Sequence, residues 1–132
     1  MAPKSRVSGE GKAVFITGCD SGFGFGLAKR LESLGFTVFA GCLLADSGGE
    51  GSKKLRTECS SRLSTVQIDV TDDGQVQAAV QQVKDRLPKG SKGRVVNITS
   101  VEGLRAGPMT GAYSMTKAAS EFFTDSLRYM FF

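Results

Sequence analysis

Tyr113 and Lys117 are four residues apart, a spacing that places both side chains on one face of a helix. A phenol can exchange a proton with a substrate oxygen, although its ordinary pKa of about 10 is too high for a base at neutral pH. A neighbouring ammonium group favours the phenolate form. Ser100, at the predicted end of the preceding strand, adds a hydroxyl that can hydrogen-bond the same oxygen. These residues predict proton transfer at an alcohol or carbonyl oxygen.

A glycine-rich segment near the start of the chain, residues 17–24 (TGCDSGFG), follows an apolar run and leads into a helix-period segment. A strand, a glycine loop and a helix in this order let the backbone approach a pyrophosphate, whose charge then faces the helix N-terminal amides. The loop therefore predicts a dinucleotide site. The alternative is a tight strand-to-helix turn without a ligand. Gly26 is interpreted as a position where the helix packs closely.

Composition narrows the functional classes. The chain has 132 residues and a net charge of +4, which fits one domain. It contains no histidine, which excludes His-based hydrolytic triads and the usual His-containing zinc sites. Its three cysteines form no C-x-x-C pair, so we expect a reducing compartment. Basic residues do not interleave with aromatic ones, so we expect no nucleic-acid partner.

Short β-like runs alternate with helix-period segments, a pattern typical of an α/β fold in which helices cover a parallel sheet. We expect strands at 13–17, 36–41, 63–70 and 94–99, and helices at 22–34, 53–59, about 72–87 and 113–130. The predicted architecture is a three-layer αβα, Rossmann-like domain with a short sheet of about four parallel strands. Residues 1–12 are predicted to be a flexible N-terminal segment, and residues 13–132 the dinucleotide-binding domain.

The chain resembles the short-chain dehydrogenase/reductase family, whose glycine fingerprint is T-G-x-x-x-G-x-G and whose catalytic motif is Y-x-x-x-K. Residues 18–29 (GCDSGFGFGLAK) and 35–43 (GFTVFAGCL) are similar to the branch that contains hydroxybutyrate, retinol and 17β-hydroxysteroid dehydrogenases. The resemblance implies hydride exchange between nicotinamide and a small alcohol or ketone.

The resemblance also implies roles for individual residues. The catalytic residues would be Ser100, Tyr113 and Lys117. The cofactor-binding residues would be Thr17, Gly18, Asp20, Ser21, Gly22, Phe23, Gly24, Asp69, Val70, Tyr113 and Lys117. Asp69 and Val70 would close the third strand beside the adenine, with a strand-end cap as the alternative for Asp69. Residues 41–43 (GCL), at the end of the second strand, offer neither an acid for a ribose hydroxyl nor a base for a 2′-phosphate. We expect NAD, with NADP left open.

Compared with the family, the chain is expected to be an incomplete domain, internally deleted and truncated at its C-terminus. The family places an additional strand and a long helix where this chain has only residues 88–93. We expect the strand at 94–99 to take the empty position beside 13–17, which gives the strand order third, second, first, fourth. Tyr113 would then shift by roughly 4.8 Å, one strand spacing, and turnover would be very weak or absent.

Other readings follow from the shortened chain. It could be a non-catalytic isoform that binds dinucleotide or a full-length partner. Its last helix, with the apolar end 129–132 (YMFF), could form a homo-oligomer or fold back over the gap. Family analogy suggests mitochondria or the endoplasmic reticulum as the compartment, and it is the only ground for membrane association.

Overall fold

The computed structural model describes residues 7–105 and 107–131, with side chains as far as residue 126. Residues 1–6 of the expected flexible segment and the apolar side chains at 129–132 lie outside that description. The chain forms two compact units, residues 1–96 and residues 97–132, and each is described by itself.

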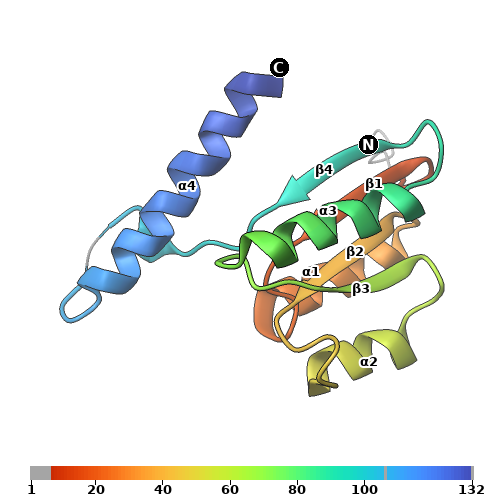
Figure 1. The fold of residues 1–132 in the computed structure, drawn as a ribbon, viewed down its shortest axis with the longest axis horizontal. Helices are drawn as coiled ribbons and strands as arrows, with labels where there is room; N and C mark the ends of the chain where they lie inside the picture. Colours follow the sequence, from red (N-terminus) through yellow and green to blue (C-terminus); the bar gives the residue numbers. More distant parts are fainter. Residues whose placement is uncertain (1–6, 106, 132) are drawn as a thin grey trace, which may run out of the picture. The chain divides into compact units, whose positions relative to one another are not determined.

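The first unit alternates strands and helices as the sequence predicts. Its elements are β1 (Lys12–Ile16), α1 (Gly22–Ser33), β2 (Thr37–Cys42), α2 (Glu50–Glu58), β3 (Leu63–Gln67), α3 (Asp73–Arg86) and β4 (Lys92–Val96). The strands form one parallel sheet in the order β3-β2-β1-β4, which Figure 1 shows side by side. This confirms the predicted fold class and the predicted strand order, with β4 directly beside β1.

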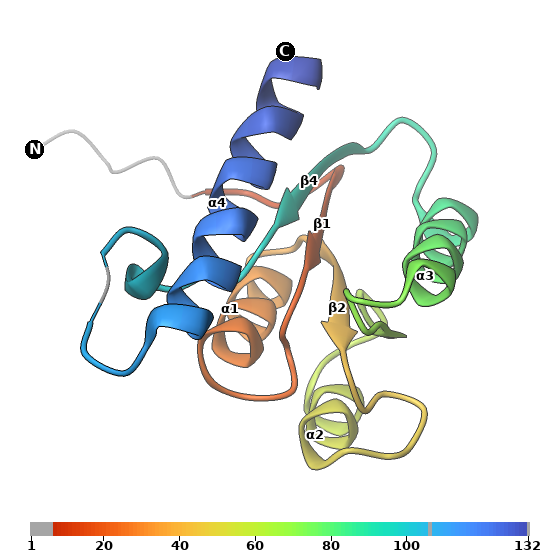
Figure 2. The same ribbon diagram turned by 60° about the vertical axis from the view of Figure 1, so that its left-hand side comes forward.

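Helices cover both faces of this sheet. Figure 2 shows α1 and α3 on opposite sides of the strands, and α2 contacts β3 and α1. Because neighbouring residues of a strand point to opposite faces, each strand contributes to two cores. The core on the α3 side contains Ala13, Phe39, Val66, Ile68 and Ala79. Fully buried Phe39 alone contributes about 1.5–3 kcal/mol of hydrophobic free energy to folding.

Several predicted boundaries were wrong, and those of the third strand, the fourth strand and the second helix have tertiary causes. The third strand ends at Gln67 rather than residue 70, because its partner β2 ends at the paired residue Cys42. The fourth strand is Lys92–Val96 rather than 94–99, because its register follows β1 from Lys12 to Ile16. Ser100 therefore lies beyond the strand.

The second helix begins three residues earlier than predicted, at Glu50 instead of residue 53. A backbone hydrogen bond of 2.8 Å from Gly49 N to Leu44 O closes the turn before it. The hydroxyl of Ser52 donates to Gly49 O at 2.9 Å. These contacts start the helix inside a segment whose sequence is polar and rich in glycine.

The second unit consists of a short 3₁₀ helix, η1 (Val101–Gly103), and the long helix α4 (Gly111–Phe131). The segment before η1 is bound along α4. Asn97 Nδ2 donates to Thr124 Oγ1 at 3.0 Å, and the Thr99 hydroxyl hydrogen-bonds Glu121. Among the described residues, no helix is both long enough and apolar enough to span a membrane.

Candidate functional site

The glycine loop between β1 and α1 has a backbone that side chains would obstruct. A Cβ on Gly24 would lie 2.2 Å from the carbonyl oxygen of Gly18, so α1 can approach the loop this closely only with glycine there. Gly18 and Gly22 have φ values of 67° and 61°, a conformation that glycine adopts without strain. In contrast, nothing lies within 4 Å of a Cβ built on Gly26. The interpretation of Gly26 as a close packing position was therefore wrong.

The N-terminus of α1 carries no internal negative charge. The N-cap residue Ser21 makes no side-chain capping bond, and the first turn holds no acidic residue. The positive end of the helix dipole and its first amides are thus not neutralised by a side chain of α1. Nothing lies within 4 Å of a Cβ built on Gly22, so the backbone of this residue is accessible. These properties fit a phosphate-bearing ligand such as a dinucleotide.

Asp20 links the glycine loop to the chain just after β2. Its carboxylate accepts hydrogen bonds from Leu43 N at 2.7 Å and Leu44 N at 3.2 Å. These bonds hold the loop against the end of β2. The sequence suggested Asp20 as a cofactor residue, and the structure gives its carboxylate two partners within the chain.

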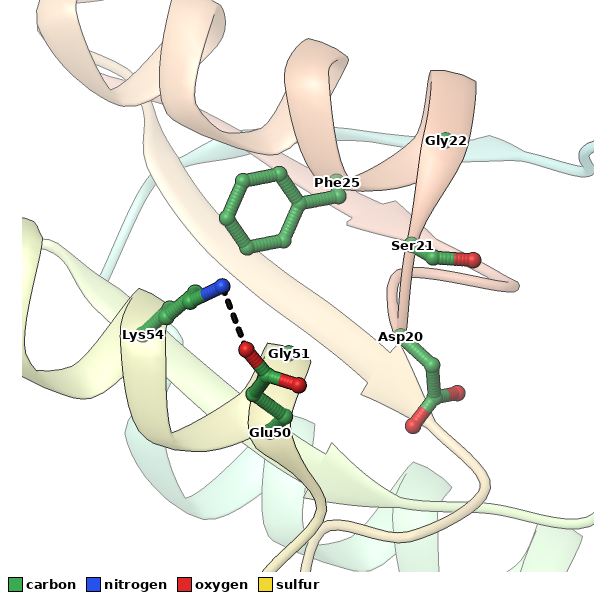
Figure 3. Close-up of a pocket in the computed structure, with 7 residues that line it drawn as sticks. All are labelled: Asp20, Ser21, Gly22, Phe25, Glu50, Gly51 and Lys54. Atoms are coloured by element: carbon green, nitrogen blue, oxygen red, sulfur yellow. Dashed lines mark ion pairs between the residues drawn. The ribbon is translucent and has the colours of Figure 1, made fainter.

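An open cavity of about 280 Å³ lies between the glycine loop and the start of α2. Figure 3 shows the residues that line it: Asp20, Ser21, Gly22, Phe25, Glu50, Gly51 and Lys54. Glu50 and Lys54 form an ion pair of 2.6 Å. Sequence reasoning missed the α2 side of this cavity. The one signal available was the pair of opposite charges four residues apart, which is favourable at the start of a helix.

Two cysteines are buried at this site, Cys19 within the glycine loop and Cys42 at the end of β2. Burial raises the pKa of Cys19 and of Cys42 to about 12, so both thiols stay protonated at neutral pH. Cys19 Sγ donates to Ile16 O at 3.3 Å, and its backbone N donates to Gly41 O at 2.8 Å. The two hydrogen bonds of Cys19 join the glycine loop to β1 and β2.

The remaining suggested cofactor residues differ in their hydrogen bonds and in their exposure to solvent. Asp69 follows β3 instead of closing it, and its carboxylate accepts from the hydroxyl and backbone N of Thr71 at 2.7 and 2.9 Å. These hydrogen bonds lower the pKa of Asp69. The side chains of Val70 and Phe23 are largely exposed. Thr17 N donates to Val96 O at 3.1 Å, where β1 meets β4.

The suggested catalytic residues all belong to the second unit. Tyr113 and Lys117 lie one turn apart on α4, with Lys117 Nζ 5.6 Å from the centre of the phenol ring. Lys117 Nζ also donates to Ile98 O at 3.3 Å. Ser100 is the N-cap of η1, and its hydroxyl accepts from Glu102 N at 3.2 Å.

The short helix η1 is packed tightly against α4. A Cβ on Gly103 would lie 2.9 Å from the Lys117 carbonyl carbon. Thr110 and Ser114 donate to Glu102 at 2.9 and 3.3 Å. The second unit thus holds the segment that carries Ser100 beside the turn that carries Lys117, while the loop residues are brought together in the first unit.

Several proteins similar to this chain are dehydrogenases. The chain is 38% identical over 170 aligned positions to rat mitochondrial D-beta-hydroxybutyrate dehydrogenase, covering 90% of this chain and 50% of the relative. It is 36% identical to mouse estradiol 17-beta-dehydrogenase 2, covering 89% and 43%. It is 34% identical to human retinol dehydrogenase 16, covering 89% and 51%. The chain thus spans about half the length of the curated relatives it matches.

These alignments extend over more positions than the 132 residues of this chain, so the relatives carry internal residues without a counterpart here. A crystal structure of a short-chain dehydrogenase from Streptomyces avermitilis shares the fold, with a TM-score of 0.70 and 22% identity, over 88% of this chain and 59% of that one. The family model described as short chain dehydrogenase matches residues 12–90 and 85–130. With nearly all of its length matched, the chain belongs to the short-chain dehydrogenase family of oxidoreductases.

Proposed function

We propose that this chain binds a nicotinamide dinucleotide at the glycine loop and supports weak oxidoreduction of a small alcohol or ketone. The observation that carries the proposal is the close approach of Gly24 to Gly18 beside a helix terminus without an internal cap. That geometry suits a pyrophosphate, and family members generally use NAD or NADP. Hydride exchange with the substrate carbon is the chemistry that the nicotinamide supplies when bound.

The residues of the second unit take the proton-transfer roles in this proposal. The Tyr113 hydroxyl exchanges a proton with the substrate oxygen, and the Ser100 hydroxyl orients that oxygen by a hydrogen bond. The Lys117 ammonium, one helical turn from the phenol, favours the phenolate electrostatically. In the first unit, the glycine loop from Thr17 to Gly24 holds the phosphates, with Asp69 and Val70 beside the adenine.

The relatives suggest the substrate class and the cofactor. Their names specify hydroxybutyrate, estradiol and retinol, so we propose a secondary or primary alcohol, or the matching carbonyl compound, as substrate. NAD is the proposed cofactor because residues 41–43, at the end of β2, include no basic residue for a 2′-phosphate. The mitochondrial relative makes mitochondria a reasonable compartment to test, alongside the endoplasmic reticulum.

Weak turnover follows from the position of β4. This strand pairs directly with β1, whereas the family resemblance places another strand between the corresponding two. Strand β4 therefore lies about one strand spacing, roughly 4.8 Å, closer to β1 than the corresponding strand of a complete domain. Misplacement of a catalytic group by about 1 Å can cost about 100-fold in rate.

The proposal is tested by following NADH absorbance with acetoacetate, estrone or retinal, and NAD⁺ reduction with the matching alcohols. We expect a rate far below that of complete rat hydroxybutyrate dehydrogenase, and we expect Tyr113→Phe to abolish it while NADH still binds. A rate close to that of the complete enzyme would contradict the proposed impairment. A rate unchanged by Tyr113→Phe would contradict the role of Tyr113.

A non-catalytic role is the second candidate, in which the chain binds dinucleotide or pairs with a full-length relative. The exposed apolar side chains of Met115, Phe122 and Phe123 on α4 favour it, because such a surface suits a partner. Saturable NADH binding without any Tyr113-dependent turnover, together with co-purification of a full-length relative, would select this candidate.

A further inference from the structure

The cavity beside the glycine loop has a second wall that is held firmly in place. A Cβ on Gly51 would lie 1.9 Å from the carbonyl oxygen of Asp20, so the first turn of α2 lies directly against the loop. Buried Leu55 and Ser52 anchor α2 to the rest of the unit. Arg56 Nη2 adds a hydrogen bond of 2.9 Å to Ala45 O. The backbone that carries Glu50 and Lys54 therefore has a defined position relative to the glycine loop.

The usual positions for reading the adenosine ribose are not available in this chain. The end of β2 offers only the uncharged residues 41–43. The carboxylate of Asp20 accepts hydrogen bonds from Leu43 N and Leu44 N. Neither the carboxylate nor these two amides are therefore free to bind the ribose. Apart from Asp20, the charged side chains that line the cavity are Glu50 and Lys54, both on α2.

The Glu50 and Lys54 side chains favour different groups at the 2′ position of the ribose. An ionised carboxylate accepts a hydrogen bond from a 2′-hydroxyl and repels a 2′-phosphate, whereas an ammonium attracts the phosphate. The hydrogen bond from Lys54 lowers the pKa of Glu50, so the carboxylate stays ionised at neutral pH. Figure 3 shows the Lys54 amine turned toward Glu50. With Asp20, the cavity carries two negative charges and one positive charge.

We propose that Glu50 and Lys54 select the dinucleotide, with the Glu50 carboxylate favouring the 2′-hydroxyl of NAD and the Lys54 ammonium setting how strongly the 2′-phosphate of NADP is rejected. This inference rests on the proposed function, because it assigns the adenosine end of the dinucleotide to the cavity beside the glycine loop. In this proposal, the residues that distinguish NAD from NADP lie at the start of α2 rather than at the end of β2.

Three neutral variants test the assignment: Glu50→Gln, Lys54→Gln and the matched control Glu58→Gln. Glu58 is on the same helix, is exposed, and forms a 2.5 Å ion pair with Lys29, but it does not line the cavity. The measurement is the dissociation constant of each variant for NADH and for NADPH by calorimetry, at about 0.05 M and about 0.5 M salt. Circular dichroism confirms that each variant is folded.

The expected changes have opposite signs. Glu50→Gln lowers the NADPH/NADH ratio of dissociation constants on the order of tenfold at low salt, because a repulsion of the 2′-phosphate is removed. Lys54→Gln raises the same ratio several-fold. Glu58→Gln leaves it within about twofold. Both shifts shrink at high salt, because the charges concerned are exposed and screened.

The outcomes separate the two proposals. If the unsubstituted chain binds NADH but Glu50→Gln and Lys54→Gln leave the ratio unchanged, or shift it in the same direction, the selection by α2 is overturned while dinucleotide binding stands. If the folded, unsubstituted chain binds neither dinucleotide, the proposed function is overturned, and this inference with it.

Discussion

Two glycines of α1, two residues apart, provide a matched pair for testing the loop geometry. Replacing Gly26 with alanine places a methyl group in open space on an exposed helical position. Replacing Gly24 with alanine places the same group 2.2 Å from the Gly18 carbonyl oxygen, where ordinary contact begins at 3.4 Å. The first turn of α1 must then move by about 1 Å.

The magnitudes follow from that displacement. Gly26→Ala should stabilise the chain by roughly 0.5–1 kcal/mol, the gain of alanine over glycine within a helix. Gly24→Ala has the same gain but adds an overpacking cost of about 1–3 kcal/mol, so the free energies of unfolding of the two variants should differ by about that amount. The displacement also lengthens the backbone hydrogen bonds available to a pyrophosphate. Losing one of them, worth about 1.5–3 kcal/mol, weakens NADH binding at least about tenfold.

Urea denaturation followed by circular dichroism measures the stabilities, and calorimetry with NADH measures binding. We expect Gly26→Ala to bind NADH like the unsubstituted chain and Gly24→Ala to bind it at least about tenfold more weakly. If Gly24→Ala were as stable as Gly26→Ala and bound NADH equally well, the close approach of α1 to the loop would not be what shapes the site.

Three further predictions address the framework of the first unit. Burial raises the pKa of Cys19 and Cys42 to about 12, so iodoacetamide at pH 7.5 should label half-buried Cys59 first in the folded chain. All three cysteines should be labelled in urea. Prompt labelling of all three in the folded chain would contradict this. Leu55→Ala removes a fully buried side chain that anchors α2, so urea denaturation should show a loss of about 2–5 kcal/mol, and a loss below about 1 kcal/mol would contradict that anchoring. The hydrogen bond from Gln75 N lowers the pKa of the α3 N-cap Asp72, so its stabilisation is present above about pH 4 and is lost as the pH falls through the lowered pKa. Asp72→Ala should therefore be less stable than the parent chain at pH 7 in urea denaturation, and the difference should shrink toward pH 3; a constant difference would argue against the charged cap.

The strands could be predicted from local patterns, and their order from the family resemblance together with the short segment 88–93. Apolar runs identify the strands, and the family resemblance implies a vacant position beside β1, which β4 takes. The strand ends could not be predicted, because each strand stops where its neighbour stops. Ser100 was therefore placed at a strand end, although it caps η1.

The glycine loop was recognised from its spacing, but the surroundings of the loop depend on distant residues. Asp20 bonds amides 23 and 24 positions away, which no local pattern reveals. The first turn of α2 meets the loop where Gly51 lies against the Asp20 carbonyl, a contact between residues far apart in the sequence, so Glu50 was not expected at the cavity. The open space at Gly26 is likewise a property of tertiary packing rather than of sequence.

We propose above all that the glycine loop is a working dinucleotide site. The most direct test is calorimetric titration of the folded, monodisperse chain with NADH, compared with Gly22→Val, which places a β-branched side chain at a φ of 61° in front of the α1 amides. We expect saturable binding to the unsubstituted chain and its loss in Gly22→Val, with both proteins folded. Absence of binding to the folded chain, or equal binding to Gly22→Val, would contradict it.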